Sequence, residues 1–156
     1  MSAQLIEGAI TTPDPRPTTY AQKQSNMASV TTDLFADIDR MDARAFASYL
    51  SEDCRLRFGN ADAVAGRSAI EAAITGFFAT IKGLSHDIVH QWDVGDTTII
   101  ELKVTYTRLD ERQVTVPVVT IYRHGDQLID DYRIFIDLSP VLAKMGSPLR
   151  LGVTHR

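Results

Sequence analysis

Two residues that lie far apart in the sequence carry side chains that could transfer a proton together. Asp39 follows a segment in which apolar residues recur at helical spacing, and it lies four residues after Phe35, on the edge of the apolar side. A charge there needs a partner, because an unpaired buried charge is costly. His86, on an opposing strand, could be that partner, and the carboxylate would then select the tautomer of a general acid or base. The plainer alternative is that Asp39 pairs with Arg40 and that His86 is a surface residue.

Three other residues could add polar groups to the same site. Arg133 shares a strand face with Asp137, and it either belongs to an ion-pair network or reaches a pocket to stabilise charge on an oxygen. Tyr106 is expected on an apolar strand face, where it is either a core residue or a hydroxyl donor into a cavity. Asn60 follows a strand in a turn, where it could cap the turn or contact a ligand.

The strand that contains His86 also contains His90. Alternation of side chains places both histidines on the same face, together with Ile88 and Trp92. Their Cα atoms would be ~13 Å apart on an extended strand, which is too far for two ligands of one ion. The chain has no glycine-rich nucleotide loop and no zinc-protease motif. We therefore predict neither a metal nor a cofactor, since proton transfer needs only a positioned acid–base pair.

The elements that must position these residues can be predicted from the apolar pattern. A first helix begins at Thr31, and Asp42 is placed to cap a second one. Ser68 and Glu71 have the spacing of a capping box for a third helix, which Gly83 is placed to end. Strands are predicted at residues 54–58, 85–93, 97–109, 113–123 and 127–138.

The short connections between the last four strands make them antiparallel neighbours. We therefore predict an α+β protein with a cone-shaped fold, in which three N-terminal helices pack in a curved antiparallel sheet. Such a sheet leaves an apolar pocket at its open end. In the segment 113–123, Val116 and Val118 lie on one face, while Val119 and Ile121 lie on the other. Two apolar faces predict that the outer one is also covered, and a homodimer would cover it.

Length and composition set the domain organisation. The chain has 156 residues, of which 44% are hydrophobic and 23% charged, and this suits a single domain. Prolines at alternate positions within residues 11–19 predict that residues 1–26 form a flexible or extended N-terminal arm. Residues 27–145 are the predicted folded domain, and residues 146–156 are a predicted C-terminal tail.

Composition also argues against several classes of protein. The apolar runs are too short to span a membrane, and a net charge of −4 with a pI near 5.5 argues against a nucleic-acid partner. Cys54 is the only cysteine, which leaves no intrachain disulfide and no cysteine-based zinc site. The chain does not begin with a secretory-signal pattern, so we expect a cytoplasmic protein whose main partner is a small molecule.

Four short motifs occur in order between residues about 30 and 140. They are Asp39-Arg40-Met41-Asp42 followed by Phe46 and Tyr49-Leu50, Asp53-Cys54-Arg55-Leu56-Arg57-Phe58, Gly66-Arg67-Ser68-Ala69-Ile70 and Tyr132-Arg133-Ile134-Phe135-Ile136-Asp137-Leu138-Ser139-Pro140. In this order and spacing the chain resembles the nuclear transport factor 2-like superfamily. Within it, the chain resembles the SnoaL-like group of polyketide cyclases, ketosteroid isomerases and scytalone dehydratases. The resemblance implies the cone-shaped fold for nearly the whole predicted domain.

The resemblance also implies roles for individual residues. In the scytalone dehydratase-like branch, a first-helix aspartate works with a histidine at the start of the first long strand, and Asp39 and His86 stand at those positions. Tyr106 stands where that branch has a second histidine, Ile38 where it has a tyrosine, and an apolar residue near Val118 where it has a pocket asparagine. The polar constellation is therefore smaller than in the dehydratases.

These observations predict a cofactor-independent lyase or isomerase. Its Asp39–His86 pair would act in an apolar pocket on a hydrophobic cyclic, polyketide- or steroid-like substrate, for dehydration, isomerisation or cyclisation. Tyr106 or Arg133 would stabilise the developing oxyanion. The alternative is a non-catalytic, dimeric module of the same fold that binds a ligand or a protein. The side chains expected to contact the ligand are Phe58, Asn60, His90, Val116, Val118 and Phe135.

Overall fold

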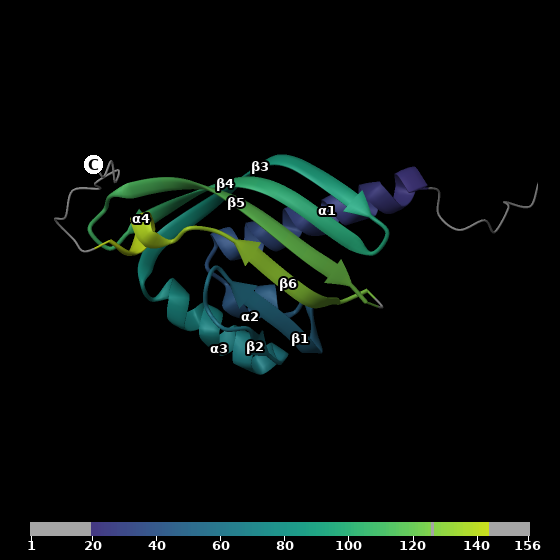
Figure 1. Ribbon diagram of the computed structural model, residues 1–156, viewed down its shortest axis with the longest axis horizontal. Coiled ribbons are helices and arrows are strands. Elements are labelled where there is room, and N and C mark those ends of the chain that lie inside the picture. The colour runs from purple at the N-terminus through teal and green to yellow at the C-terminus, as the bar shows by residue number, and fades with distance from the viewer. Residues whose placement is uncertain (1–19, 126, 144–156) are drawn as a thin grey trace, which may run out of the picture.

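The computed structural model describes residues 20–125 and 127–143, and one curved sheet of six strands runs through it (Figure 1). The strands are β1 (Leu50–Phe58), β2 (Val64–Ala65), β3 (Ile81–Val94), β4 (Thr97–Arg108), β5 (Gln113–His124) and β6 (Ile129–Phe135). Their order is β2-β1-β6-β5-β4-β3, so the first strand of the chain lies beside the last one.

The helices cover one side of this sheet, which we call the inner face, and the opposite side is the outer face. They are α1 (Tyr20–Asp39), α2 (Ala43–Ala47), α3 (Arg67–Phe78) and the short α4 (Ser139–Leu142). α1 lies along β3, and α3 packs against α2 and β1. Figure 1 shows α1 passing behind the long strands and α3 below them. None of the described helices combines the length and the apolar character needed to cross a bilayer.

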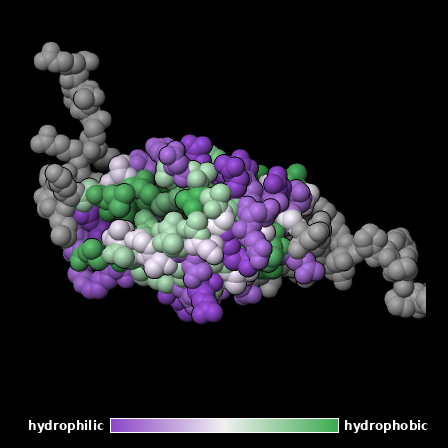
Figure 2. All heavy atoms as spheres, turned by 90° about the horizontal axis from the view of Figure 1, so that it is seen from below, coloured by the Kyte–Doolittle hydropathy of each residue, from purple (hydrophilic) through white to green (hydrophobic). Residues whose placement is uncertain are grey.

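The outward side of α3 is made of small residues rather than charged ones. Ala69, Ala72 and Ala73 are exposed, whereas Ile70 and Ile74 are buried. In the view from below, hydrophobic side chains gather toward the α4 end of the molecule, and hydrophilic ones occupy the opposite end and the rims (Figure 2).

The core forms where the alternating residues of the long strands meet the helices. In β4, Ile100, Leu102, Val104 and Tyr106 are buried, as the alternation in the sequence predicts. Burial of one such side chain stabilises the fold by roughly 1.5–3 kcal/mol. The hairpin between β3 and β4 turns at Gly95, whose φ of 61° lies in the left-handed region that glycine adopts without strain.

Local helix signals are correct in one case and wrong in another. The Asp42 cap is confirmed, because its Oδ1 accepts the Ala45 backbone N–H at 2.9 Å and α2 follows directly. The capping box of Ser68 and Glu71 is wrong. β2 holds the preceding residues beside β1, the chain turns at Gly66 with a φ of 99°, and the helix starts at once with Arg67.

Two further helix predictions are also corrected. Gly83 does not end α3, because the helix stops at Phe78 and the buried Ile81 already pairs with β4, which places Gly83 inside β3. The sequence predicts three helices, whereas the described residues contain four. α4 forms where Pro140 favours a helix start, and the Arg108 guanidinium donates to its backbone carbonyls.

The predicted sheet is correct for its long strands and wrong for its first one. β3, β4, β5 and β6 are consecutive antiparallel neighbours, but β1 pairs with β6 in parallel, with Leu56 opposite Tyr132. No short connection joins β1 to β6, so no turn in the sequence determines their relative direction.

The first helix starts earlier than the predicted Thr31. α1 begins at Tyr20, within the arm predicted for residues 1–26. The proline-rich residues 11–19 and the tail predicted at 146–156 lie outside the described residues.

Leu102 tests the core directly, because its side chain is 1% exposed in the central strand β4. We expect Leu102→Ala to lower the free energy of unfolding by about 2–5 kcal/mol through lost burial and a new cavity, measured by chemical denaturation. Leu109, just beyond the same strand, is 59% exposed. Leu109→Ala should therefore change stability by less than about 0.5 kcal/mol. Equal effects of the two substitutions would contradict this assignment of the core.

Candidate functional site

A β-bulge in β3 decides which of its side chains reach the interior. From Gly83 to Ile88 the pairing with β4 runs in register; it then skips Val89 and resumes with His90 opposite Glu101. The extra residue exchanges the two faces of the strand. His86 therefore lies on the inner face, opposite the buried Val104, while His90 lies on the outer face. The prediction that both histidines share a face is wrong for this reason.

The inward His86 meets Asp39, the last residue of α1. Its Nδ1 lies 2.5 Å from Asp39 Oδ1, and its backbone N–H donates to Oδ2 at 3.2 Å. The His86 side chain is 9% exposed and that of Asp39 is 30% exposed. Arg40 does not compete for Asp39, since its guanidinium pairs with Asp37. The structure thus brings together the two residues that the sequence singles out for acid–base chemistry.

The contacts of the imidazole determine what each nitrogen can do. A carboxylate only accepts hydrogen bonds, so Nδ1 of a neutral His86 carries the proton and Nε2 is the basic nitrogen. Phe35, one helical turn before Asp39, stacks on the ring with centroids 4.7 Å apart. The Asp39 carboxylate therefore contacts one edge of the imidazole, and the Phe35 ring covers one of its faces.

His86 lines a cavity of about 50 Å³ between the helices and the inner face of the sheet. Most of its lining is apolar and comes from α1, α2, α3 and the inward residues of the strands. Its polar groups, besides His86, are the hydroxyls of Tyr106, Thr120 and Tyr132. Burial raises the pKa of both tyrosines, so their hydroxyls stay protonated and can donate hydrogen bonds. The Thr120 hydroxyl already bonds to Tyr132, whereas no hydrogen bond to Tyr106 is found among the described residues.

The predicted site residues divide between the two faces of the sheet. Tyr106, Phe58 and Val118 line the cavity beside His86. Val116 is buried in the core but does not line the cavity. The remaining predicted residues lie elsewhere: Asn60 is exposed in the turn after β1, and His90, Arg133 and Phe135 are on the outer face.

The prediction that Arg133 reaches the pocket is wrong. Its strand neighbours Tyr132 and Ile134 point inward and line the cavity, so alternation turns Arg133 outward. Its Nε pairs with Asp131 Oδ2 at 3.0 Å, on the same face of β6. The ion-pair alternative therefore describes this residue, with Asp131 rather than Asp137 as the partner.

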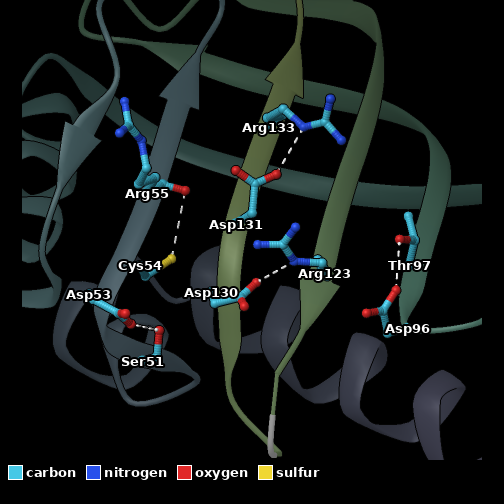
Figure 3. Close-up of polar contacts among 10 residues, drawn as sticks. All are labelled: Ser51, Asp53, Cys54, Arg55, Asp96, Thr97, Arg123, Asp130, Asp131 and Arg133. Carbon is cyan, nitrogen blue, oxygen red and sulfur yellow. Dashed lines mark hydrogen bonds and ion pairs between the residues drawn. The ribbon is translucent and has the colours of Figure 1, made fainter.

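Arginines gather on the outer face of β1, β6 and β5. Figure 3 shows the side chains of Arg55, Arg133 and Arg123 projecting from these three neighbouring strands. Arg123 Nε contacts Asp130 Oδ1 at 2.9 Å. Cys54, between the exposed residues of β1, points inward, and burial raises the pKa of its thiol to about 12, so it stays a neutral core residue.

Sequence reasoning misses several residues that line the cavity. Phe35, Thr120 and Tyr132 are among them. Thr120 has a detectable signal, because it continues the inward alternation of Val116 and Val118 along β5. Phe35 has none until its partner strand is known. Within residues 20–125 and 127–143, no group of three or more His, Cys, Asp or Glu side chains converges on a point where a metal ion could bind.

The comparisons with known proteins agree with this architecture. A family model of the SnoaL-like domain matches residues 31–132. A putative SnoaL-like polyketide cyclase from Jannaschia sp. CCS1 superposes with a TM-score of 0.69 and 18% identity over 80% of this chain and 94% of that chain. A hypothetical protein with a ketosteroid isomerase-like fold from Catenulispora acidiphila, in complex with trimethylamine, superposes with a TM-score of 0.68 and 21% identity. The match covers 76% of this chain and 93% of that chain. An epoxide hydrolase/cyclase-like enzyme of pyran-ring formation in salinomycin superposes with a TM-score of 0.65 and 15% identity. The match covers 74% of this chain and 94% of that chain.

The sheet order, the packed helices and the structural neighbours define the class of protein as one with the nuclear transport factor 2-like fold. Because the family model matches well over half of its length, the chain belongs to the SnoaL-like domain family. No curated protein sequence matches the chain.

The Asp39–His86 contact makes a prediction about the histidine tautomer. We expect neutral His86 to carry its proton on Nδ1, and Asp39→Ala to return it to the Nε2–H form that predominates in unconstrained histidine. Two-dimensional ¹H–¹⁵N spectra of the imidazoles measure this. His90, on the opposite face, is the internal control and should be unaffected. An Nε2–H tautomer of His86 in the unmodified protein would contradict the geometry.

Proposed function

We propose that the chain is a cofactor-independent enzyme in which Asp39 and His86 transfer a proton within an apolar pocket. The observation that carries the proposal is the 2.5 Å contact between the carboxylate and Nδ1, which leaves Nε2 of a cavity-lining ring as the base. Membership of the SnoaL-like family and the likeness to a putative polyketide cyclase support a catalytic reading.

The proposed reaction follows from which groups of the site can accept or donate a proton. Nε2 of His86 takes a proton from a carbon next to a carbonyl, and the electron pair of that C–H bond moves toward the carbonyl oxygen. Tyr106, protonated because burial raises its pKa, donates a hydrogen bond to that oxygen. Asp39 stabilises the imidazolium that forms. Return of the proton to another carbon is an isomerisation, and its transfer to a β-hydroxyl that leaves as water is a dehydration.

The substrate that suits this site is hydrophobic and cyclic. The lining offers aromatic and aliphatic contacts and only a few hydroxyls besides the imidazole, so an ionic substrate would lose its hydration without gaining partners. Polyketide- or steroid-like ring compounds with an activated carbon meet this requirement. Dehydration, isomerisation and cyclisation all begin with the same proton transfer.

Turnover of hydroxylated polycyclic and polyketide compounds tests the proposal. We expect His86→Ala and Asp39→Asn each to lower kcat/KM at least 100-fold, because a general base contributes about 10²–10⁴ in rate. His90→Ala, which changes a histidine on the outer face, should keep full activity. Unfolding curves must show that all three variants fold. If both site variants were as active as the unmodified chain, the acid–base proposal would be wrong.

A non-catalytic binding module is the second candidate function. Ile38 and Val118 line the cavity without a polar group, at the positions where related dehydratases carry a tyrosine and an asparagine. A module of this kind would bind the apolar compounds with the same affinity whether residue 86 is histidine or alanine. It would show no turnover that depends on His86.

We further propose that the outer face of the sheet forms a homodimer. A hollow of about 270 Å³ on this face is lined by Glu101 and by apolar side chains that include Trp92, Pro117 and Phe135. Trp92 is 44% and Phe135 54% exposed, and large apolar groups that lie together on a surface favour a protein contact. A second copy offers the same apolar surface, so a two-fold contact would cover both.

Sedimentation velocity tests this assembly. We expect Phe135→Asp to convert a dimer to a monomer, because the carboxylate would be buried without a partner at the centre of the contact. Leu142→Asp is the matched control, since Leu142 is equally exposed, at 56%, but lies in α4. A monomeric unmodified chain, or a Phe135→Asp variant that stays dimeric, would rule out this interface.

A further inference from the structure

A charged side chain lies among the apolar residues that line the hollow of the outer face. It belongs to Glu101 of β4, an exposed residue. Within the described part of the chain, Glu101 forms no ion pair. His90 lies opposite it on β3, but the His90 ring packs against Trp92. A contact that covers the hollow would therefore bury a carboxylate without a partner, which is strongly unfavourable.

An arginine on the same face also lacks a carboxylate. Arg57 lies between Leu56 and Phe58 in β1, and because those two side chains face inward, alternation turns Arg57 outward. Its neighbour across β6 is Arg133, which already pairs with Asp131 (Figure 3). No described acidic side chain pairs with Arg57. Like charges directly opposite each other on neighbouring strands repel, so a carboxylate from another molecule would stabilise Arg57.

The strand register places these two charges on either side of the apolar centre of the outer face. Glu101 lies opposite Val119 of β5, and Val119 lies opposite Phe135 of β6. Arg133, two residues before Phe135, lies opposite Arg57 of β1. The carboxylate therefore comes from β4 and the guanidinium from β1, with β5 and β6 between them. Three strand spacings separate β4 from β1, which is ~14 Å.

A two-fold axis along β5 and β6 would exchange the two charged positions. When two copies meet through this face about such an axis, β4 of one copy lies over β1 of the other, and β5 lies over β6. The strands of the two sheets are then nearly aligned, which is one of the two usual ways in which sheets pack. The two-fold symmetry repeats each contact, so two charge pairs would flank one apolar centre.

We infer that the outer face binds a second copy of this chain through two identical ion pairs, each between Glu101 and Arg57 of the partner subunit. The inference rests on the proposed homodimer and adds the contact that determines its orientation. Each pair neutralises a carboxylate that the apolar contact would otherwise bury alone, and a guanidinium that otherwise lies beside another one. Other orientations of the same two faces would bring like charges together or leave Glu101 unpaired.

Charge reversal tests the inference by sedimentation velocity. We expect Glu101→Arg and Arg57→Glu each to raise the dimer dissociation constant roughly 100-fold, because each variant alone places two pairs of like charges in its own dimer. An equal mixture of the two variants should form a heterodimer with an affinity within about tenfold of the unmodified dimer, because both pairs then join opposite charges.

A matched control separates this effect from a general change of charge. Arg44 is exposed like Arg57 but lies in α2, on the helix side of the sheet, so Arg44→Glu should leave the dissociation constant unchanged. If a charge-reversed variant fails to fold, Glu101→Gln and Arg57→Gln take its place. Combined, these two should weaken the dimer no more than either does alone, whereas independent sites would multiply their effects.

The possible outcomes also distinguish the ion pairs from the homodimer itself. The inference is overturned if single charge reversals leave the dimer intact, or if the mixture forms no heterodimer. A dimer that dissociates on Phe135→Asp but does not respond to charge reversal would refute the ion pairs and keep the proposed interface. A monomeric unmodified chain would refute both.

Discussion

The extra residue in β3 is the constraint on which both faces of the sheet depend. Side chains alternate along a strand, so one inserted residue exchanges the faces for every residue beyond it. Before Val89, His86 lies opposite Val104 on the inner face, and after it Trp92 lies opposite Ile99 on the outer face. In an unbroken strand, Trp92 would point toward the helices like His86. One unpaired residue therefore keeps a histidine inside and places a large aromatic side chain on the apolar outer surface.

The inward histidine becomes a chemical site because α1 ends against it. Asp39 contacts the imidazole through Oδ1 and the backbone N–H of the same residue through Oδ2, and Phe35 stacks on the ring one turn earlier. These contacts join the end of a helix to the strand that it covers. They also satisfy a half-buried carboxylate and define which imidazole nitrogen is basic. The same interactions thus serve the stability of the fold and the proposed chemistry.

The interior and the outer face divide the polar groups between them. Inside, Tyr106 and Tyr132 carry hydroxyls whose raised pKa keeps them neutral, which suits a cavity with few charges. On the outer face, Arg123 of β5 pairs with Asp130 and Arg133 of β6 pairs with Asp131 (Figure 3). The charged Arg133 and the neutral Tyr132 are adjacent in β6, so their side chains point to opposite faces of the sheet. The described cavity therefore has one imidazole and a few hydroxyls in a mostly apolar lining.

The sequence by itself determined the features with local causes. The Asp42 cap spans three residues, and the inward alternation of β4 follows from its own pattern. The resemblance to a known family correctly indicated the fold, and it placed Asp39 and His86 in one site. Only the tertiary structure decided the parallel pairing of β1 with β6, the bulge at Val89 and the outward position of Arg133. The direction of β1 and the faces of β3 and β6 depend on register with strands that are distant in the chain, and a pattern within one strand carries no information about that register.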